Sequence, residues 1–489
     1  MVSRKPHQFC FALLMFCIAS ATLSAQSFRV QCPTYTTLHP NPATLPAGST
    51  PAPGGVKCQQ ISGGDGFATM ADGHQIFLFG FGPLSGLADI KNGLPGTEPA
   101  SIFNAAFTGD PTDAVSNGAV GLLNPATGLV NPADIMNAGV MNAESPAPTM
   151  SIDEDDEFFL TLTNVGMIMR PDLFEQHTVH FHGYPNASSF FDGVPDASVA
   201  INIGGSFTYY YTAPDAGTYF WHCHIAPPEH LQMGMVGQLY VRPRQNRVAT
   251  GSSLWAAAHA SNIAHGSSNG IVCSDLLCTG ETPLPSADPG ALRAAASVKY
   301  AYNDGDGSTA YDSEYPIQLM GFDPNFHFVG TTFNPEGFAD MKDKYFLLSG
   351  RGYPDTVNPN YITTEAADGV SRPSQPVRSL ITIDKTNGVT KKALVRISDL
   401  SVSEFSTLAT IGIPMQVIAI NARLLRDMAG KNMYYKTNSV TLGGGESVDV
   451  LLDATNVPTG TYFLYTTNLD HLSNDAENFG GQMTEIVVK

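Results

Sequence analysis

The residues that could do chemistry gather in two short histidine-rich motifs, which hold six of the 13 histidines. The members of the two motifs are His177, His180, His182, His222, Cys223, His224, His230 and Met235. Imidazole, thiolate and thioether groups are ligands of soft and borderline metal ions. Metal binding is therefore the chemistry that the two motifs predict.

Four of these residues match the ligand set of a blue-copper site. Such a site takes two imidazoles, one thiolate and a weak axial thioether, because copper(I) prefers soft sulfur while copper(II) accepts nitrogen. The chain supplies this set as His177, Cys223, His230 and Met235. We therefore predict copper at a type 1 site.

The other four histidines, which we call the histidine quartet, are predicted to share a second face. The quartet consists of His180, His182, His222 and His224. Side chains alternate between the two faces of a strand. Cys223 therefore points away from its two histidine neighbours, and His177 has the opposite parity to the other two histidines of its motif. We expect the quartet to hold additional copper.

Each of these residues also has a structural explanation. A buried histidine is usually a hydrogen-bonding residue, and a buried cysteine or methionine often fills a core. Core packing does not require six histidines, one cysteine and one methionine in this order and parity, so we interpret them as ligands. Histidines outside the motifs are interpreted as structural or surface residues, namely His39, His74, His259, His265, His327 and His471.

Short strands must position these ligands. Only 14% of the residues are charged, glycine and proline are abundant, and β-branched and aromatic runs are short and bounded by turn residues. This pattern predicts an all-β fold. The strand patterns nearest the motifs lie at 157–165, 206–213, 217–224 and 235–241.

Two strand-rich regions have the same order of motifs. Glycine-rich turns and strands at 204–206, 209–211, 217–220 and 235–241 are matched by those at 443–445, 448–452, 460–463 and 483–488. Two copies of one Greek-key β-sandwich are the simplest explanation. Tyrosine and two threonines at 465–467 replace the His-Cys-His of the first copy, so we expect only the first copy to bind metal.

Composition shifts divide the chain into segments. We predict a signal peptide at 1–25, an irregular arm at 26–60, a copper-binding domain at 61–243 with a loop insertion at about 84–146, a linker at 244–313 and a copper-free domain at 314–489.

The N-terminal residues predict export. Arg4 and Lys5 precede an apolar run at 9–23, and Ala25 stands before the expected cleavage site. No long apolar stretch follows, so we expect a soluble protein with no membrane span, in the periplasm or outside the cell. The net charge of −19 argues against nucleic acid or an anionic membrane surface as a partner.

Cysteine usage agrees with an oxidising compartment. Of the seven cysteines, Cys10 and Cys17 leave with the signal peptide. Spacing suggests two disulfide pairs, Cys32 with Cys58 and Cys273 with Cys278, although sequence alone leaves the connectivity open. Cys223 is then the special thiol.

The chain resembles the multicopper oxidase family, as a two-domain, laccase-like cupredoxin protein. The resemblance is carried by 177–183, 191–195, 217–224 and 234–235 in the copper-binding cupredoxin domain. The segments 346–354, 395–397, 414–419 and 443–454 look like the copper-free middle domain of the same enzymes. The resemblance implies two cupredoxin-like sandwiches and a copper-dependent oxidoreductase.

The resemblance also implies roles for individual residues. In the family, a type 1 copper takes single electrons from a reducing donor, and dioxygen is reduced to water at a trinuclear copper cluster of type 2 and type 3 copper. Cys223 would be ligand and electron exit, its histidine neighbours would conduct electrons, and His180 and His182 would be further cluster ligands. Asp192 would orient water and relay protons, or form an ordinary Asp-Gly turn.

Three departures from the family keep alternatives open. The family cluster uses four His-x-His type pairs from two domains, whereas this chain offers two such pairs. A third cupredoxin domain is missing from its 489 residues. The loop between Cys223 and His230 is two residues longer than usual in the family. A blue-copper electron carrier or copper-handling protein is one alternative. A copper nitrite reductase, which would need a histidine such as His471 from a neighbour's second domain, is another.

The expected partners are small. The electron donor could be a phenol or a metal ion such as copper(I), iron(II) or manganese(II), with dioxygen as acceptor. Because four imidazoles are too few for three copper ions, we also expect a homo-oligomer in which the quartet meets another quartet or a neighbour's His471.

Overall fold

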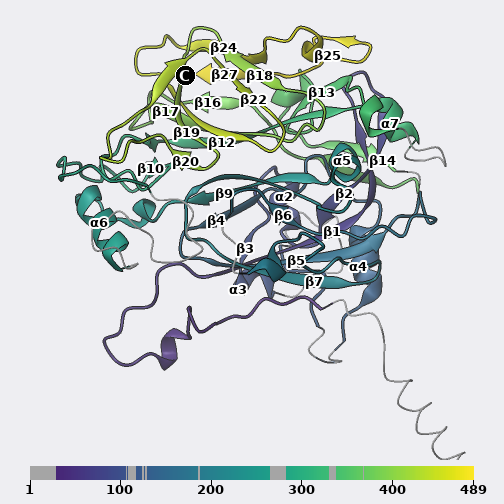
Figure 1. Ribbon diagram of the computed structural model, residues 1–489, viewed down its shortest axis with the longest axis horizontal. Coiled ribbons are helices and arrows are strands. Elements are labelled where there is room, and N and C mark those ends of the chain that lie inside the picture. Colours follow the sequence, from purple (N-terminus) through teal and green to yellow (C-terminus); the bar gives the residue numbers. More distant parts are fainter. Residues whose placement is uncertain are drawn as a thin grey trace, which may run out of the picture.

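We describe the protein from a computed structural model (Figure 1). It describes residues 29–105, 107, 117–123, 126, 129–184, 188–264, 282–329, 337–366 and 368–489. The predicted signal peptide at 1–25, His265 and the proposed pair Cys273 and Cys278 lie outside the described residues.

The first β-sandwich is built from two sheets. One has the strand order β2-β1-β5-β7 with β3 beside β1, and the other has the order β4-β9-β8-β6. The strands are β1 (Val56–Thr69), β2 (Gln75–Pro83), β3 (Glu98–Pro99), β4 (Met150–Asp153), β5 (Glu157–Gly166), β6 (His180–Phe181), β7 (Ser206–Thr212), β8 (Gly217–His222) and β9 (Val236–Arg242). Apolar side chains of both sheets form one core, which includes Trp221, Cys223 and Met235.

The second β-sandwich also has two sheets. One has the strand order β20-β19-β23-β17-β12-β13-β25-β26, with β21 beside β19, and the other has the order β16-β27-β24-β18-β22. The strands are β12 (Ser313–Phe322), β13 (Tyr345–Leu348), β16 (Ile381–Ile383), β17 (Lys392–Asp399), β18 (Ser406–Thr410), β19 (Met415–Ile420), β20 (Arg423–Leu424), β21 (Tyr435–Thr437), β22 (Ser439–Leu442), β23 (Ser447–Asp453), β24 (Gly460–Thr466), β25 (Ser473–Asn474), β26 (Glu477–Asn478) and β27 (Met483–Val488). Residues such as Ile397, Leu408 and Val450 fill its core. These two sandwiches confirm the all-β prediction.

Strand pairing supports the internal repeat. In the first sandwich β1 is parallel to β5, β4 is parallel to β9, and β8 is antiparallel to β9. In the second sandwich β12 is parallel to β17, β16 is parallel to β27, and β24 is antiparallel to β27. The same mixed pattern therefore occurs twice, and β8 with its following Cys223 corresponds to β24, which ends at Thr466.

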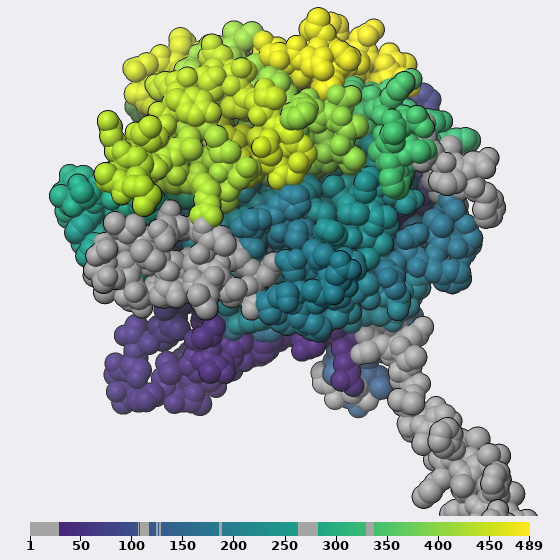
Figure 2. All heavy atoms as spheres, viewed as in Figure 1, coloured from purple at the N-terminus to yellow at the C-terminus, as the bar shows by residue number. Residues whose placement is uncertain are grey.

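The two sandwiches pack directly on each other, with the second (green to yellow) seated on the first (Figures 1 and 2). An apolar cluster at this contact combines residues of both, including Leu78, Phe220, Met320 and Leu347. Polar contacts accompany it, since Thr218 Oγ1 donates to Asp449 at 2.6 Å. The outer face of β8, which carries His222, is thus close to the second sandwich.

Segments predicted to be irregular contain more structure than expected. The arm is irregular apart from a short turn at Pro42–Thr44, but β1 begins at Val56, inside the predicted arm. The predicted loop insertion contains α2 (Leu87–Lys91), α3 (Ala100–Phe103), α4 (Pro132–Gly139) and β3, and its apolar residues pack in a cluster that also includes Val165 of β5 and Ala366. Short helices among glycine and asparagine leave too weak a periodic signal to be recognised.

The predicted linker also has defined elements. It contains a turn of helix at Arg244–Arg247, α6 (Leu254–Ala264) and the paired strands β10 (Lys299–Tyr300) and β11 (Ala310–Tyr311). Outside the two sandwiches, β14 (Ile362–Glu365) pairs with β15 (Ser371–Gln375), and α5 (Pro227–Gln232) and α7 (Pro324–Val329) complete the main elements.

A disulfide joins the arm to the first sheet. Cys32 bonds to Cys58 on β1, which confirms that proposed pair. Cys223 is free and buried, as the sequence predicts. In the described part of the chain, we find no helix long and apolar enough to cross a membrane.

Candidate metal centres

The alternation of β6 and β8 separates two groups of candidate ligands. His180 pairs with His222 and Phe181 with Trp221 in antiparallel register. Phe181, Trp221 and the following Cys223 belong to the first core, so His180 and His222 lie on the opposite face. This placement follows from the pleat of a β-strand.

The first group, which we call the buried group, consists of His177, Cys223 and His230. One ligand atom of each lies within 4.8 Å of the others, and all three residues have 0% exposure. His177 is fixed by a bridge to Ile201. Cys223 follows the end of β8, and His230 lies on α5. Three separate segments therefore converge on one point inside the core.

The sulfur of Cys223 has only weak donors around it. The backbone N–H of Thr178 donates to Sγ at 3.4 Å, and Nδ1 of His230 lies 3.3 Å from it. Met235 is also fully buried, and its backbone bonds to both other segments: its C=O accepts from Cys223 N–H and its N–H donates to His230 C=O. The backbone thus holds Met235 beside both of these predicted ligands.

His177 fits a metal ion better than it fits a purely structural role. Neither of its ring nitrogens has a hydrogen-bond partner, although both are buried. Burial, together with the nearby His230, lowers the pKa of His177 well below its ordinary value, so the ring is neutral and can offer a lone pair. An unpaired buried polar group costs about 1–3 kcal/mol. A metal ion between His177 and Cys223 would give a ring nitrogen of His177 the partner that it lacks.

His230 connects the buried group to the surface through Glu175. Its Nε2 lies 3.4 Å from a carboxylate oxygen of Glu175, whose side chain is 26% exposed. Burial alone would lower the pKa of His230, but its electrostatic and hydrogen-bond contacts with Cys223 and Glu175 outweigh burial and raise the pKa to about 9. Glu175 lies outside any strand, so the sequence carried no periodic signal for it.

The second group is the histidine quartet. Ligand atoms of His180, His182 and His222 lie within 4.8 Å of one another. The ring of His224 lies 5.0 Å from that of His180 and stacks on that of His222 at 5.6 Å. The structure therefore brings all four rings together but puts three of them around one point.

Backbone carbonyls set the tautomers of two of these rings. Nδ1 of His180 lies 2.7 Å from the C=O of Asp192, and Nδ1 of His222 lies 2.7 Å from the C=O of Cys223. Since a carbonyl can only accept, each Nδ1 carries the proton and each Nε2 keeps its lone pair. Burial, the largest influence, lowers the pKa of His222 to about 3, so this ring is neutral.

Asp192 contacts the quartet mainly as a positioning residue. Besides its carbonyl contact, a carboxylate oxygen lies 3.5 Å from Nδ1 of His180. The turn also depends on Gly193, where φ is +81° and a Cβ would lie 1.9 Å from the C=O of Val179. The Asp-Gly turn therefore brings Asp192 to His180, and its role in orienting water and relaying protons stays a prediction.

The second sandwich supplies no histidine to the quartet. Its only two histidines, His327 and His471, are each 1% exposed, and His471 stacks on Phe346 at 3.9 Å. It approaches the quartet at Gly445, where an added Cβ would lie 2.8 Å from Nδ1 of His182. The expectation that a neighbour's His471 could complete the quartet is therefore wrong, because that ring is buried within its own sandwich.

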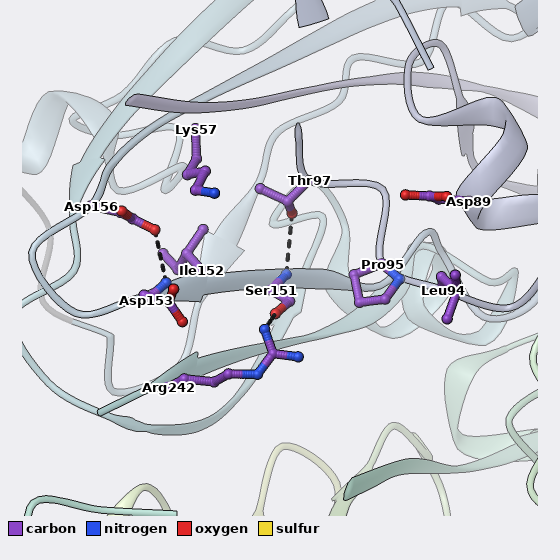
Figure 3. Close-up of a pocket in the computed structure, with 10 residues that line it drawn as sticks. All are labelled: Lys57, Asp89, Leu94, Pro95, Thr97, Ser151, Ile152, Asp153, Asp156 and Arg242. Atoms are coloured by element: carbon purple, nitrogen blue, oxygen red, sulfur yellow. Dashed lines mark hydrogen bonds between the residues drawn. The ribbon is translucent and has the colours of Figure 1, made fainter. Parts of the chain in front are cut away.

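The other described histidines have partners away from the two groups. His39 contacts Glu157, His74 contacts Asp72, and His259 stacks on Trp255. A surface pocket of about 250 Å³ lies beside Lys57, Ser151 and Arg242 (Figure 3). No histidine or cysteine lines this pocket. Neither observation adds a ligand to the centres above.

Comparison with known sequences connects the first sandwich with copper enzymes. Residues 127–246 match the family model described as multicopper oxidase. The laccase abr2 of Aspergillus fumigatus is 33% identical over 109 residues, 22% of this chain and 17% of that protein. The L-ascorbate oxidase of Cucumis sativus is 33% identical over 113 residues, 22% of this chain and 17% of the enzyme. Each match thus spans about one sixth of the relative.

Comparison with solved structures shows the fold. The blue copper oxidase from Nitrosomonas europaea matches with a TM-score of 0.50 and 17% identity, covering 88% of this chain and 85% of that one. The multicopper oxidase mgLAC matches with a TM-score of 0.50 and 15% identity, covering 88% and 86%. Both sandwiches have the cupredoxin-like fold of these structures, and copper is the cofactor that the match at residues 127–246 and these ligand groups indicate.

Proposed function

We propose that this chain, whose residues 127–246 are a multicopper oxidase domain, is a copper-dependent oxidoreductase. It would take single electrons from a reducing donor at a type 1 copper in the buried group and pass them to a second copper site at the histidine quartet. One observation carries the proposal: an unbonded thiol, Cys223, lies in a closed core beside two imidazoles, one of which, His177, has no hydrogen-bond partner.

The chain's own residues would connect the two sites. Bound copper would supply one-electron redox chemistry that protein side chains lack. Cys223 is bonded covalently to His222, and Nδ1–H of His222 also donates to the C=O of Cys223 at 2.7 Å. A short covalent path and a hydrogen bond thus join the sulfur of the buried group to a ligand of the quartet.

The surroundings of His230 support a phenol or a metal ion as the donor. His230 itself is fully buried, and Glu175 lies between its Nε2 and the surface. A carboxylate at this edge can accept the proton that a phenol releases on oxidation, and it attracts a metal cation. Dioxygen is the proposed acceptor, by analogy with the relatives named as oxidases and laccases.

Export belongs to the same proposal. The disulfide between Cys32 and Cys58 supports folding in an oxidising compartment. The predicted signal peptide at 1–25 lies outside the described residues. We therefore propose a periplasmic or secreted protein.

A blue-copper electron carrier is the second candidate. It is favoured by the quartet, which offers four imidazoles where a trinuclear cluster needs roughly twice that number. A copper nitrite reductase has no such support, because His471 is buried within the second sandwich and His327 is buried against Phe77 of the first. In a homo-oligomer, the remaining way to enlarge the site would be to bring two quartets together across a symmetry axis.

The test combines the absorption spectrum with oxygen uptake. Copper-loaded protein should show an intense visible charge-transfer band and consume dioxygen with a phenol, iron(II) or copper(I) as donor. Cys223→Ser should lose both the band and the turnover while keeping its circular-dichroism spectrum. A band that survives in Cys223→Ser would overturn the type 1 assignment, and a blue protein without oxygen uptake would favour the carrier.

A further inference from the structure

We infer that the histidine quartet binds a single copper ion per chain, held by His180, His182 and His222, with one coordination position open to solvent. The inference rests on the proposed function for the choice of copper but concerns a different site from the buried group. It departs from the trinuclear cluster that the family resemblance implies.

The first reason is the convergence of three nitrogens on one point. The ligand atoms of these three rings lie within 4.8 Å of one another, and Nε2 of His182 lies 3.0 Å from Nε2 of His222. Bonds of about 2.0 Å in a tetrahedral site would put ligand atoms about 3.3 Å apart. The observed set is therefore close to the size that one ion needs.

The second reason is how the backbone holds each ring. His180 and His222 donate from Nδ1 to backbone carbonyls. Nδ1 of His182 lies against the backbone of Gly445, since a Cβ added there would lie 2.8 Å from it. Nε2 of each of the three rings is thus left without a backbone partner. Second-shell bonds of this kind orient the imidazole ligands of metal sites.

The facing nitrogens support the same conclusion. Nε2 of His182 lies 3.0 Å from Nε2 of His222, and because His222 carries its proton on Nδ1, Nε2–H of His182 can donate across this contact when no ion is bound. The two nitrogens therefore already face the same point. A metal ion bound to both would replace the proton between them.

The third reason is the shortage of further ligands in the described chain. His224 stacks flat on His222, with an interplanar angle of 27°, and falls outside the set of three converging ligand atoms. The backbone of His224 is fixed by Thr178, which accepts its N–H at 2.9 Å. The described histidines outside the motifs are either buried away from the quartet or paired elsewhere. One ion with three ligands is what these residues can complete.

The open position follows from exposure. His182 is exposed and the side chain of His180 is 18% exposed, whereas the buried group is closed. Metal sites with three protein ligands and an open fourth position bind water or a small ligand there. The class of ligand is therefore a small anion or a diatomic molecule, for which azide is a convenient probe.

The experiment uses Cys223→Ser, which removes the thiolate of the buried group. Copper(II) is titrated into the full-length variant, and bound copper is compared with the integrated electron paramagnetic resonance signal. We expect one copper per chain with a large hyperfine splitting, a spin count equal to the bound copper, and a spectral change on adding azide. Adding His182→Ala should lower the copper affinity at least tenfold, whereas adding His224→Ala should keep one ion per chain.

Several outcomes would overturn the inference. Three coppers per chain, or a spin count well below the copper content, would indicate coupled ions of a larger cluster. Three coppers per dimer, with copper counted by metal analysis and the dimer identified by light scattering, would indicate that two quartets meet. Binding that does not change in His182→Ala would mean an adventitious ion only. The proposed function is tested by a different measurement, the blue absorption band of the wild-type protein, so the two can fail independently.

Discussion

Nε2 of His182 and Nε2 of His222 face each other across 3.0 Å on the outer face of the first sandwich. His182 follows β6 and His222 ends β8, and these two strands pair directly. Cys223, the next residue after His222, points into the core on the other side of the same sheet. One peptide bond thus separates a candidate ligand of the quartet from the sulfur-bearing residue of the buried group.

The two faces should be separable by mutation. In His180→Ala with His224→Ala, we expect less bound copper but an unchanged blue band, because both rings lie on the face opposite Cys223. His230→Ala should remove or strongly shift the band, since Nδ1 of His230 lies 3.3 Å from the sulfur. Visible spectra and metal analysis of the two variants check this. Loss of colour in the double variant would contradict the separation.

Glu175 should tune the reduction potential of the buried group. Its carboxylate lies 3.4 Å from Nε2 of His230, where a negative charge favours the more positive, oxidised metal. Glu175→Gln should therefore raise the midpoint potential measured by redox titration of the blue band. Asp172→Asn is the control, because Asp172 pairs with Arg170 at 2.8 Å. An equal shift in both variants would point to a general charge effect.

Gly193 should be required at its position, whereas Gly183 should tolerate change better. Both glycines have positive φ, +81° at Gly193 and +69° at Gly183. A Cβ added at Gly193 would lie 1.9 Å from a backbone oxygen, whereas a Cβ added at Gly183 would have no atom within 4 Å. Gly183→Ala should cost about 1 kcal/mol of unfolding free energy. Gly193→Ala should cost about 3 kcal/mol or more, because the backbone has to move.

Urea unfolding of the two glycine variants measures these costs. Gly193→Ala should also weaken copper binding at the quartet, since the turn at Asp192 holds Nδ1 of His180. Equal unfolding free energies in the two variants would show that the turn relaxes easily.

Asp343 should make the protein less stable as the pH rises. Burial, the largest cause, and the nearby charges of Glu404, Asp323 and Asp399 raise its pKa from 3.8 to about 7, although Ser403 donates to it. The folded state therefore binds a proton more tightly than the unfolded state. The unfolding free energy should fall between about pH 4 and pH 7, by up to a few kcal/mol.

Asp343→Asn is the matched variant for this effect. It cannot ionise, and it can still accept the hydrogen bond that Gln232 donates at 2.8 Å. Urea unfolding from pH 4 to pH 8 should show a smaller decline in Asp343→Asn than in the wild type. Parallel curves would mean that Asp343 does not titrate in this range.

Much of the architecture could be read from the sequence. Alternation of apolar residues, the repeated glycine-rich turns and the tyrosine and threonines at 465–467 predicted two sandwiches of which only one carries clustered ligands. Parity alone separated Cys223 from its histidine neighbours, because the strand pleat has a period of two residues whatever the surrounding fold. The pair Cys32 and Cys58 was also predictable, since few cysteines remain after the signal peptide.

Tertiary structure decided the relations between segments distant in sequence. No local pattern indicates that Gly445 of the second sandwich touches His182, that Phe79 of β2 packs its ring 5.1 Å from that of His230, or that His471 is buried against Phe346. These contacts depend on how whole sheets stack. A strand's period determines which face a side chain occupies, but only the packed fold determines what that face meets.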